Sequence, residues 1–263
     1  MTRLFIPSQA SHWYSKDGIP VHQVPNKSKP GQMRQTTLRD GKSLGLLPSV
    51  TSVVKAVLAK PQLESWKQEQ AVLAALTLPR LPDENDTDFA KRVVMDAESI
   101  AENAANKGTK IHNAIERYLM TGEKCLDLDV AHLVEPFYDW ANENITNVIK
   151  CEETIVSQDG YAGRLDLLAE FQGIGLAVAD FKTRKKTDGK LASYAEDCIQ
   201  LAAYSQALEV YDYAHLSLLI NSEEPESPFI KQWSREDVND HRDVFNHLFS
   251  VWCILKKYRP KIK

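Results

Sequence analysis

Two carboxylates and one ammonium group lie close together in the middle of the sequence. Asp166 lies in the segment YAGRLDLLAEF, and Asp180 and Lys182 lie in the following segment IGLAVADFKT. Like charges that face each other in a sheet destabilise it unless a ligand binds them. A divalent cation is such a ligand, since Mg²⁺ prefers oxygen donors. Lys182 is then placed to orient or deprotonate an attacking water and to stabilise phosphate charge.

The register of two predicted hairpins decides whether these groups share a face. A two-residue loop at 159–160 places Glu153 opposite Asp166, and a three-residue loop at 172–174 places Asp166 opposite Asp180. Directly opposed side chains point to the same face, and strand alternation turns the lysine two positions later to that face as well. The same alternation predicts an apolar opposite face. Its residues are Leu165, Leu167, Ala177, Ala179 and Phe181.

A solvated face of salt bridges is the alternative interpretation of these charges. Glu152 stands beside Glu153, so either of them is a candidate for the position that faces Asp166. A slip of one residue in a hairpin would send a carboxylate to the other side of the sheet. The two interpretations therefore differ in which acidic side chains come together.

Apolar periodicity predicts helices before and after the strand region. Residues 1–47 are rich in Gly, Pro, Ser and charge and predict an irregular or short-stranded segment, after which Ser49 is the expected N-cap of a helix. The helical patterns cover 49–59, a stretch after Pro61, 87–120 with an interruption at Gly108, and 130–148 with a kink near Pro136. Strands are predicted at 151–158, 161–171 and 174–183, then a helix at 194–210, strands at 213–222 and 227–233, and a helix at 235–257 with Val244, Leu248, Val251 and Leu255 inward.

The composition is that of an ordinary globular protein, with an uneven distribution of charge. The chain has 263 residues, of which 43% are hydrophobic and 26% charged, so collagen-like, low-complexity and wholly disordered classes are excluded. Residues 182–190 carry a net charge of +4 and residues 256–263 a net charge of +5. The net charge of the whole chain is −4, so the remaining residues carry a net charge of −13. Two concentrated basic segments can guide a polyanion even in an acidic protein.

The sequence predicts a reducing, cytoplasmic setting in a bacterial or phage-infected cell. No apolar stretch approaches 18 residues, which excludes a transmembrane helix and a membrane partner, and the N-terminus lacks a signal or transit pattern. The four cysteines lie far apart in the sequence, with no C-x-x-C pair. They are Cys125, Cys151, Cys198 and Cys253. This scatter argues against both a disulfide scaffold and an iron–sulfur cluster.

Several motifs, in the same order along the chain, resemble a known nuclease family. GRLD at 163–166 followed by DFKT at 180–183 resembles the PD-(D/E)XK nuclease superfamily, in particular its RecB-like exonuclease branch. GTKIH at 108–112 with Glu116 is similar to the helical histidine motif of that branch, and QLAAY at 200–204 to its Gln-x-x-x-Tyr motif. The segments PSVTSVVKAVLAKPQLESWKQE and AEFQGIGLAVADFKT resemble the mitochondrial genome maintenance exonuclease group. The "PD" of the superfamily stands here as Leu165-Asp166, so only the Asp is informative.

The resemblance implies a role for each matching residue. His112, Asp166 and Asp180 would hold one or two Mg²⁺ or Mn²⁺ ions, and Lys182 would be the catalytic lysine. Glu116 lies one turn after His112 and would orient its imidazole, with an exposed helix-face carboxylate as the alternative.

The remaining candidate residues are one further acidic position and several residues expected near the substrate. Glu153 matches an acidic catalytic position on the preceding strand, and Gln200 and Tyr204 share a helix face at the rim of the site. Thr183, Arg184 and Lys185 are expected phosphate contacts. Trp66 has the helical spacing of a core residue, with base stacking as the alternative.

The expected fold is α/β, with a restriction-endonuclease-like mixed β-sheet core flanked by helices and an N-terminal helical arm over the active site. The expected organisation is 1–47 as an irregular segment, 48–150 as the helical arm and 151–263 as the nuclease core. The expected function is metal-dependent hydrolysis of DNA, as an exonuclease that prefers single strands with a free end, among replication, recombination or repair proteins. The alternatives are a flap or branched-DNA endonuclease, an inactive DNA-binding accessory protein on the same fold, and an RNA nuclease.

Overall fold

The computed structural model describes residues 12–59 and 61–262, which form a mixed α/β protein. Residues 1–11 of the predicted irregular N-terminal segment lie outside the described residues. The helices are α1 (Leu38–Leu44), α2 (Val50–Val57), α3 (Pro61–Thr77), α4 (Asp86–Thr121), α5 (Ala131–Asn144), α6 (Ala195–Leu208) and α7 (Arg235–Lys256). The strands are β1 (Trp13–Tyr14), β2 (Gln23–Pro25), β3 (Met33–Gln35), β4 (Leu47–Pro48), β5 (Ile145–Val156), β6 (Ala162–Phe171), β7 (Gly175–Arg184), β8 (Ala214–Asn221) and β9 (Phe229–Gln232).

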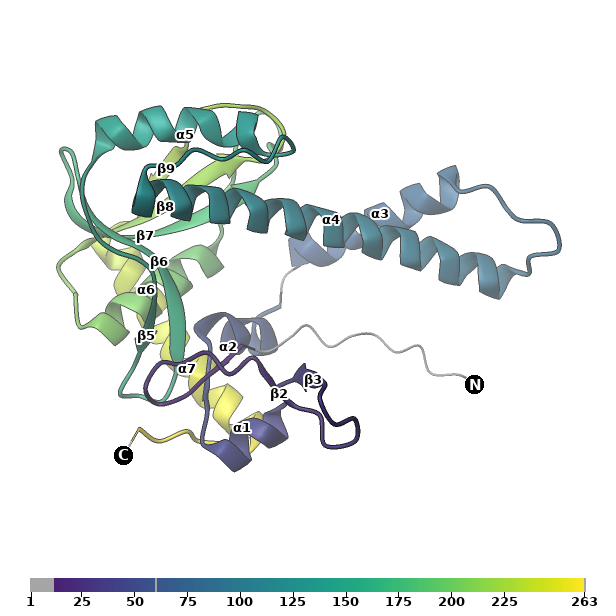
Figure 1. Ribbon diagram of the computed structural model, residues 1–263, viewed down its shortest axis with the longest axis horizontal. Coiled ribbons are helices and arrows are strands. Elements are labelled where there is room, and N and C mark those ends of the chain that lie inside the picture. The colour runs from purple at the N-terminus through teal and green to yellow at the C-terminus, as the bar shows by residue number, and fades with distance from the viewer. Residues whose placement is uncertain (1–11, 60, 263) are drawn as a thin grey trace.

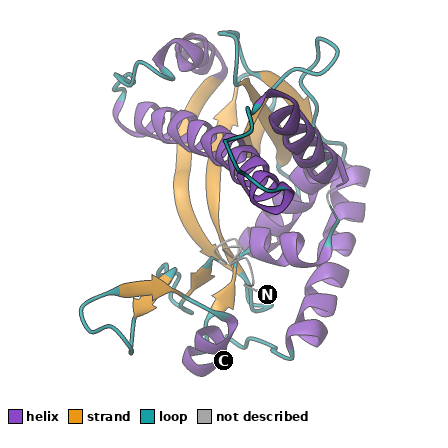
Figure 2. Ribbon diagram, turned by 90° about the vertical axis from the view of Figure 1, so that its right-hand side faces the viewer, coloured by secondary structure: helices purple, strands orange, loops and turns teal. Residues whose placement is uncertain are grey.

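A five-stranded sheet in the order β5-β6-β7-β8-β9 forms the centre of the molecule. β7 and β8 are parallel, joined by a crossover that contains α6, and the other neighbours are antiparallel. Helices cover both faces of this sheet (Figures 1 and 2). The mixed α/β class and the three-strand meander are as predicted.

The sheet separates two apolar cores. On one face, α4 and α5 pack against side chains such as Leu167 and Phe181, and on the other, α2, α6 and α7 pack against Val178 and its neighbours. The predicted apolar face is confirmed for Leu167, Ala177, Ala179 and Phe181, which share the first core. Leu165 is buried in the second core instead, because the regular alternation of β6 breaks at the residue that follows it, Asp166.

α3 and α4 form a helical hairpin that projects from the body of the molecule (Figure 1). α4 begins at the N-cap Asn85 and runs through Gly108 without the interruption that its sequence suggests. Beyond Val93, its buried residues lie near its end, at Ile111, Ala114 and Ile115, where the helix joins the core. One long helix therefore carries the outer arm and also positions His112 at the sheet.

Two predicted boundaries shift in the structure. Ser49 is the N-cap of α2 as expected, and its side chain accepts a hydrogen bond from the backbone N–H of Ser52. The predicted helix 130–148 ends at Asn144, and β5 begins at once with Ile145, six residues before the predicted strand. Pro136 lies inside α5.

The predicted inward face of α7 is wrong for three of its four residues, and only Leu248 packs against the second core as predicted. Val244, Val251 and Leu255 are 40%, 40% and 64% exposed. The buried side chains are instead Val238, Phe245, Trp252 and Cys253. The two aromatic rings fill more of the space against α2 and α6 than the aliphatic stripe would, and their burial rotates that stripe outward.

A buried histidine in β8 predicts a pH-dependent stability. His215 is 4% exposed, and burial lowers its pKa from 6.5 to about 4. The unfolded chain therefore binds a proton that the folded chain excludes, so the stability present above pH 6.5 is lost as the pH falls toward 4. We expect His215→Gln to remove about 3 kcal/mol of this pH dependence, measured by urea unfolding at several pH values. His132→Gln, at an exposed histidine, is the control. If the free energy of unfolding changed with pH equally in the parent and in His215→Gln, the assignment would be contradicted.

No helix in the described ranges is long and apolar enough to cross a membrane.

Candidate active site

Asp166 lies where β6 and β7 part from each other. The last paired residues before it are Leu167 and Ala179, so the ladder stops one step short of Asp166 and Asp180. The Oδ2 atom of Asp166 accepts a hydrogen bond from the backbone N–H of Phe181 at 2.8 Å in place of a ladder partner. Its side chain is only 9% exposed. A carboxylate is therefore fixed by the backbone at the opening between two strands.

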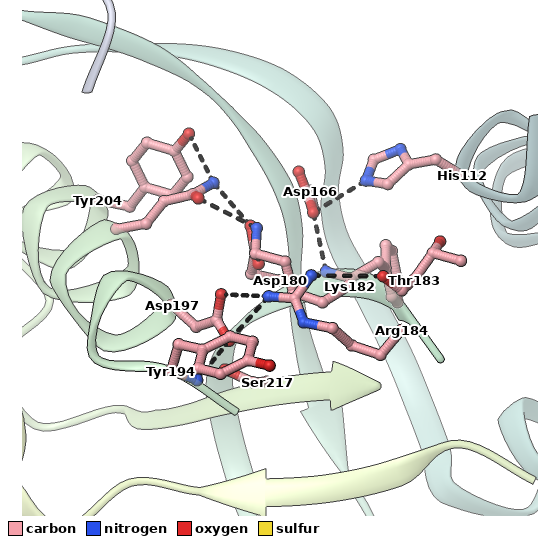
Figure 3. A network of polar contacts seen from close by, with 12 residues as sticks. His112, Asp166, Asp180, Lys182, Thr183, Arg184, Tyr194, Asp197, Tyr204 and Ser217 are labelled. Atoms are coloured by element: carbon pink, nitrogen blue, oxygen red, sulfur yellow. Dashed lines mark hydrogen bonds and ion pairs between the residues drawn. The ribbon is translucent and has the colours of Figure 1, made fainter. Parts of the chain in front are cut away.

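His112 of α4 lies between two carboxylates. Its Nε2 atom is 2.9 Å from Oδ2 of Asp166 (Figure 3). Its Nδ1 atom is 2.8 Å from Oε1 of Glu152. Burial alone would lower the pKa of His112, but the two carboxylates outweigh it and raise the pKa to about 10. Burial likewise would raise the pKa of Asp166, but the hydrogen bond and charge of His112 hold it below its ordinary value. The imidazolium thus supplies the positive charge that two converging carboxylates require.

Glu152, rather than Glu153, joins this cluster. In the β5–β6 ladder Glu153 faces Leu165 and Cys151 faces Leu167, which leaves Glu152 opposite Asp166. Glu153 instead forms an ion pair with Lys150, with its side chain 49% exposed. The predicted catalytic placement of Glu153 is therefore wrong.

The cause of this shift is the length of the first hairpin loop. The N–H of Ser157 donates to the carbonyl of Tyr161 at 2.9 Å, so the loop has three residues, 158–160, rather than the predicted two. Gly160 in this loop has a φ of 99°, as three-residue hairpin loops require. Glu152 itself has a φ of 51°, a strained value for a side chain with a Cβ, which turns its carboxylate toward His112.

The second hairpin has the predicted register and places Asp180 in a separate network. Phe171 faces Gly175 across a three-residue loop. Asp180 is fully buried, its Oδ1 accepts a hydrogen bond from Nε2 of Gln200 at 2.7 Å, and its carboxylate forms an ion pair with Lys182. Burial raises the pKa of Asp180 to about 8.

Lys182 and Gln200 complete this second network. The Nζ atom of Lys182 donates to Oε1 of Gln200 at 3.1 Å, and Gln200 also contacts the hydroxyl of Tyr204 at 3.1 Å (Figure 3). Burial alone would lower the pKa of Lys182, but the charges of Asp180, Asp166 and Asp197 raise it overall. The predicted shared helix face of Gln200 and Tyr204 is thus confirmed. Both side chains are buried rather than at the rim of the site. Lys182 stays protonated at neutral pH, which favours orienting a water over deprotonating it.

The three expected phosphate contacts after Lys182 have different surroundings. Arg184 binds the carboxylate of Asp197 through two hydrogen bonds of 2.9 and 3.2 Å and lies over the ring of Tyr194. Its guanidinium is therefore occupied within the protein, against the prediction. Thr183 and Lys185 both line the cleft described below, where Lys185 lies 2.8 Å from the carboxylate of Glu223.

Glu116 reaches the histidine only indirectly. It contacts Nη2 of Arg164 at 3.1 Å, and Arg164 in turn forms an ion pair with Glu152. The predicted direct contact with His112 is wrong, because Glu152 occupies the ring nitrogen that Glu116 was expected to hold. Arg164 was missed from the sequence, and Glu152 was considered there only as the alternative to Glu153. The strand position of Arg164, two residues before Asp166, was the available signal, since such residues share a face.

A cleft of 790 Å³ opens over these groups between the helical hairpin and the sheet. Its walls combine an indole ring, several cations and, from the strands, Glu152 and Lys182. The residues that define it are Trp66, Lys107, His112, Arg164, Lys182 and Lys185. Trp66 is half-buried here and is not a core residue, against the prediction. A second cavity of 230 Å³ lies against α2 and α6, and Lys182 lines both cavities.

The donor atoms of His112, Glu152 and Asp166 lie within 4.8 Å of one another. Within the described ranges, this is the one group of His, Cys, Asp or Glu side chains close enough to hold a metal ion. Two carboxylates and an imidazole suit Mn²⁺ well and Mg²⁺ acceptably, since both cations favour carboxylate oxygen. Asp180 lies outside the group, because Lys182 and Gln200 hold its oxygens.

In comparisons with known proteins, no family model matches the chain, and no curated protein matches it either.

Proposed function

We propose that the chain is a metal-dependent deoxyribonuclease with a restriction-endonuclease-like core, acting as an exonuclease that prefers single-stranded DNA. The observation that carries the proposal is that the His112–Glu152–Asp166 group and the Asp180–Lys182 pair meet at one cleft, which His112, Glu152 and Lys182 line. A mixed sheet whose central strands part at these residues supports the proposed core. Cations along the cleft suit a polyanionic substrate.

The chain's own residues divide the work of such a reaction. A divalent cation held by His112, Glu152 and Asp166 would supply Lewis-acid stabilisation of the charge that develops on the phosphate. Lys182 holds an ammonium group at the cleft floor, where it binds a phosphate oxygen and orients the attacking water. Gln200 fixes both Lys182 and Asp180, so the ammonium keeps its direction.

The shape of the cleft favours a single strand. Trp66 offers a half-buried ring in the cleft wall, and Lys107 and Lys185 line the same cleft. Aromatic rings and cations along one groove are typical of proteins that bind single strands, because each base stacks and each phosphate is neutralised. Base pairs of a duplex bury the faces that such a ring would contact.

The test is hydrolysis of three DNA substrates, each with Mg²⁺, with Mn²⁺ and with chelator. The substrates are end-labelled linear single-stranded DNA, end-labelled blunt duplex and circular single-stranded DNA. Metal-dependent loss of linear single-stranded DNA, with blunt duplex and circular single strands left intact, is the expected result. Cutting of the circular strand would show that the protein is an endonuclease of the same fold rather than an exonuclease. Binding of DNA without product under either metal would indicate an inactive accessory protein, and preferential cutting of a matched RNA strand would change the substrate class.

An acidic residue in the cleft wall predicts a gain of affinity on mutation. The carboxylate of Glu223 neutralises Lys185 at 2.8 Å, so Glu223→Gln should free this ammonium for a phosphate. We expect the Kd for a single-stranded oligonucleotide in chelator to fall roughly threefold, as loss of an exposed ion pair allows. One added phosphate contact should also steepen the dependence on salt.

The matched control is Glu224→Gln. Glu224 is 73% exposed and lies 3.9 Å from Lys186, outside the cleft lining. Both substitutions remove one negative charge, so an equal gain in affinity from the two would show a general charge effect and contradict a specific role for Glu223.

A further inference from the structure

The segment that follows α7 is anchored to the body of the molecule. The hydroxyl of Tyr258 lies within hydrogen-bond distance of the carbonyl oxygens of Gly41 and Leu46, at 3.2 and 2.8 Å. Two residues further on, Pro260 is buried. Its carbonyl oxygen would lie only 2.7 Å from a Cβ atom at the position of Gly160, so this approach to the first hairpin loop requires glycine. The C-terminal segment is therefore a fixed part of the fold.

The anchored segment presents its basic side chains to solvent. Lys257, Arg259 and Lys261 alternate with the anchoring residues, as in an extended chain, and all three are exposed. None of the three forms an ion pair with a carboxylate in the described part of the chain. The carboxylate of Asp159, in the neighbouring hairpin loop, is bound by Nε2 of Gln206 at 2.8 Å. We call the three unpaired cations the C-terminal strip.

The C-terminal strip leads along β6 toward the cleft. Ile262, the last described residue, packs against the cluster of Tyr14, Leu47 and Ala162. Arg164 lies two residues after Ala162 and therefore on the same face of β6, about 7 Å further along the strand. Arg164 lines the cleft and contacts α4. The strip and the cleft thus adjoin on one face of the sheet, at the end of the molecule that lies away from α5 (Figure 1).

The spacing and the charge of the strip suit a chain of phosphates. Two residues of an extended polypeptide span about 7 Å, close to the separation of consecutive phosphates along an extended DNA strand. Residues 256–262 carry a net charge of +4 and contain no acidic residue, although the whole chain has a net charge of −4. Such a local concentration of one charge attracts a polyanion whatever the net charge of the protein.

We propose that the C-terminal strip binds the phosphates of the DNA strand that occupies the cleft, beyond Arg164. Lys261 is the member nearest to the cleft, followed by Arg259 and then Lys257. The inference rests on the proposed function for the identity of the polyanion. Contacts to phosphate carry no base specificity. The strip therefore adds affinity for long strands of any sequence and none for strands too short to reach it.

The test is the binding of single-stranded oligonucleotides in chelator, where hydrolysis plays no part. Two lengths are compared, about 4 and about 16 nucleotides, the ends of the usual range for one single-strand-binding groove. The triple variant Lys257→Gln, Arg259→Gln, Lys261→Gln leaves every anchoring residue in place. We expect its Kd for the longer oligonucleotide to rise at least about tenfold at low salt, and the slope of log Kd against log salt to fall by about 2, because three phosphate contacts are lost. Its Kd for the shorter oligonucleotide should equal that of the parent.

The matched control is the triple variant Arg117→Gln, Lys124→Gln, Arg235→Gln, which removes three exposed cations that line neither the cleft nor the strip. Arg235 begins α7, whose 22 residues separate it from the strip by about 33 Å. This variant should bind both oligonucleotides like the parent. Far-UV circular dichroism and melting temperature check that each variant is folded.

Several outcomes would overturn the proposal. They are an unchanged Kd for the longer oligonucleotide, an equal loss of affinity for the two lengths, and an equal loss in the two triple variants. A strip variant that loses binding to anionic phospholipid vesicles but keeps its affinity for the longer oligonucleotide would also overturn it, in favour of a membrane surface. Length-dependent binding that needs the strip, in a protein that cuts no DNA, would refute the proposed hydrolysis and still support the strip.

Discussion

Lys182→Ala is expected to lower metal-dependent hydrolysis of single-stranded DNA by at least about a hundredfold, the usual contribution of a positioned acid–base or charged group. Lys182 lines the cleft and the smaller cavity beside it, so its ammonium is accessible to a strand bound in the cleft. Its ammonium is also held by Asp180 and Gln200 and therefore stands in one place before substrate arrives. Initial rates at saturating DNA measure the effect.

The control for this prediction separates charge from position. Lys186→Ala removes a neighbouring lysine that pairs with Glu226 and does not line the cleft, so it should leave the rate within a few-fold of the parent. Lys182→Met keeps most of the volume in case the alanine variant is destabilised, and it should be equally inactive. Unchanged hydrolysis in a folded Lys182→Met variant would remove Lys182 from the mechanism.

The sequence was sufficient for the mixed α/β class, for the three-strand meander and for the register of one of its two hairpins. Apolar alternation and turn residues predicted the meander, and the three-residue loop at 172–174 gave the correct register between β6 and β7. The four-residue spacing also placed Gln200 and Tyr204 on one helix face, as predicted, and that face lies toward the sheet.

The acidic partner of Asp166 on β5 was predicted wrongly because the first hairpin loop is one residue longer than predicted. Asp159-Gly160 is a strong two-residue turn signal, yet Ser157 and Tyr161 close a three-residue loop around it. That difference exchanges Glu153 for Glu152, since neighbouring strand residues point to opposite faces. The positive φ of Glu152 then reflects tertiary contacts with His112 and Arg164, which no local pattern contains.

Tertiary packing explains the two errors in helix faces. In α7 the stripe of Val244, Val251 and Leu255 has the better aliphatic periodicity, but burying Phe245 and Trp252 removes more apolar surface from water. Trp66 has core-like spacing, but its helix α3 contains one buried residue, Ala74, because the hairpin projects from the body. Periodicity identifies an apolar face, and only the packing of the whole chain decides what covers it.

Asp166→Asn is expected to abolish the stabilisation of the fold by Mn²⁺ together with hydrolysis. In the parent, Mn²⁺ bound to the native state should raise the melting temperature in proportion to the logarithm of its concentration. Asp166 is the carboxylate shared by His112 and the backbone of Phe181, so its loss removes one donor and releases the imidazole. Glu153→Gln, a change in an exposed carboxylate one residue from Glu152, is the control and should melt like the parent at each Mn²⁺ concentration.

The pH dependence of Mn²⁺ binding tests the same group without reference to activity. His112 has its pKa raised to about 10 by its two carboxylate partners, so it holds a proton at neutral pH that a cation on its ring nitrogen must displace. Mn²⁺ affinity should therefore rise about tenfold per pH unit between about pH 6 and pH 8, with one proton released per ion. Calorimetry in buffers of different ionisation enthalpy counts that proton. Affinity that is independent of pH would mean that the ion does not displace this proton and therefore binds elsewhere.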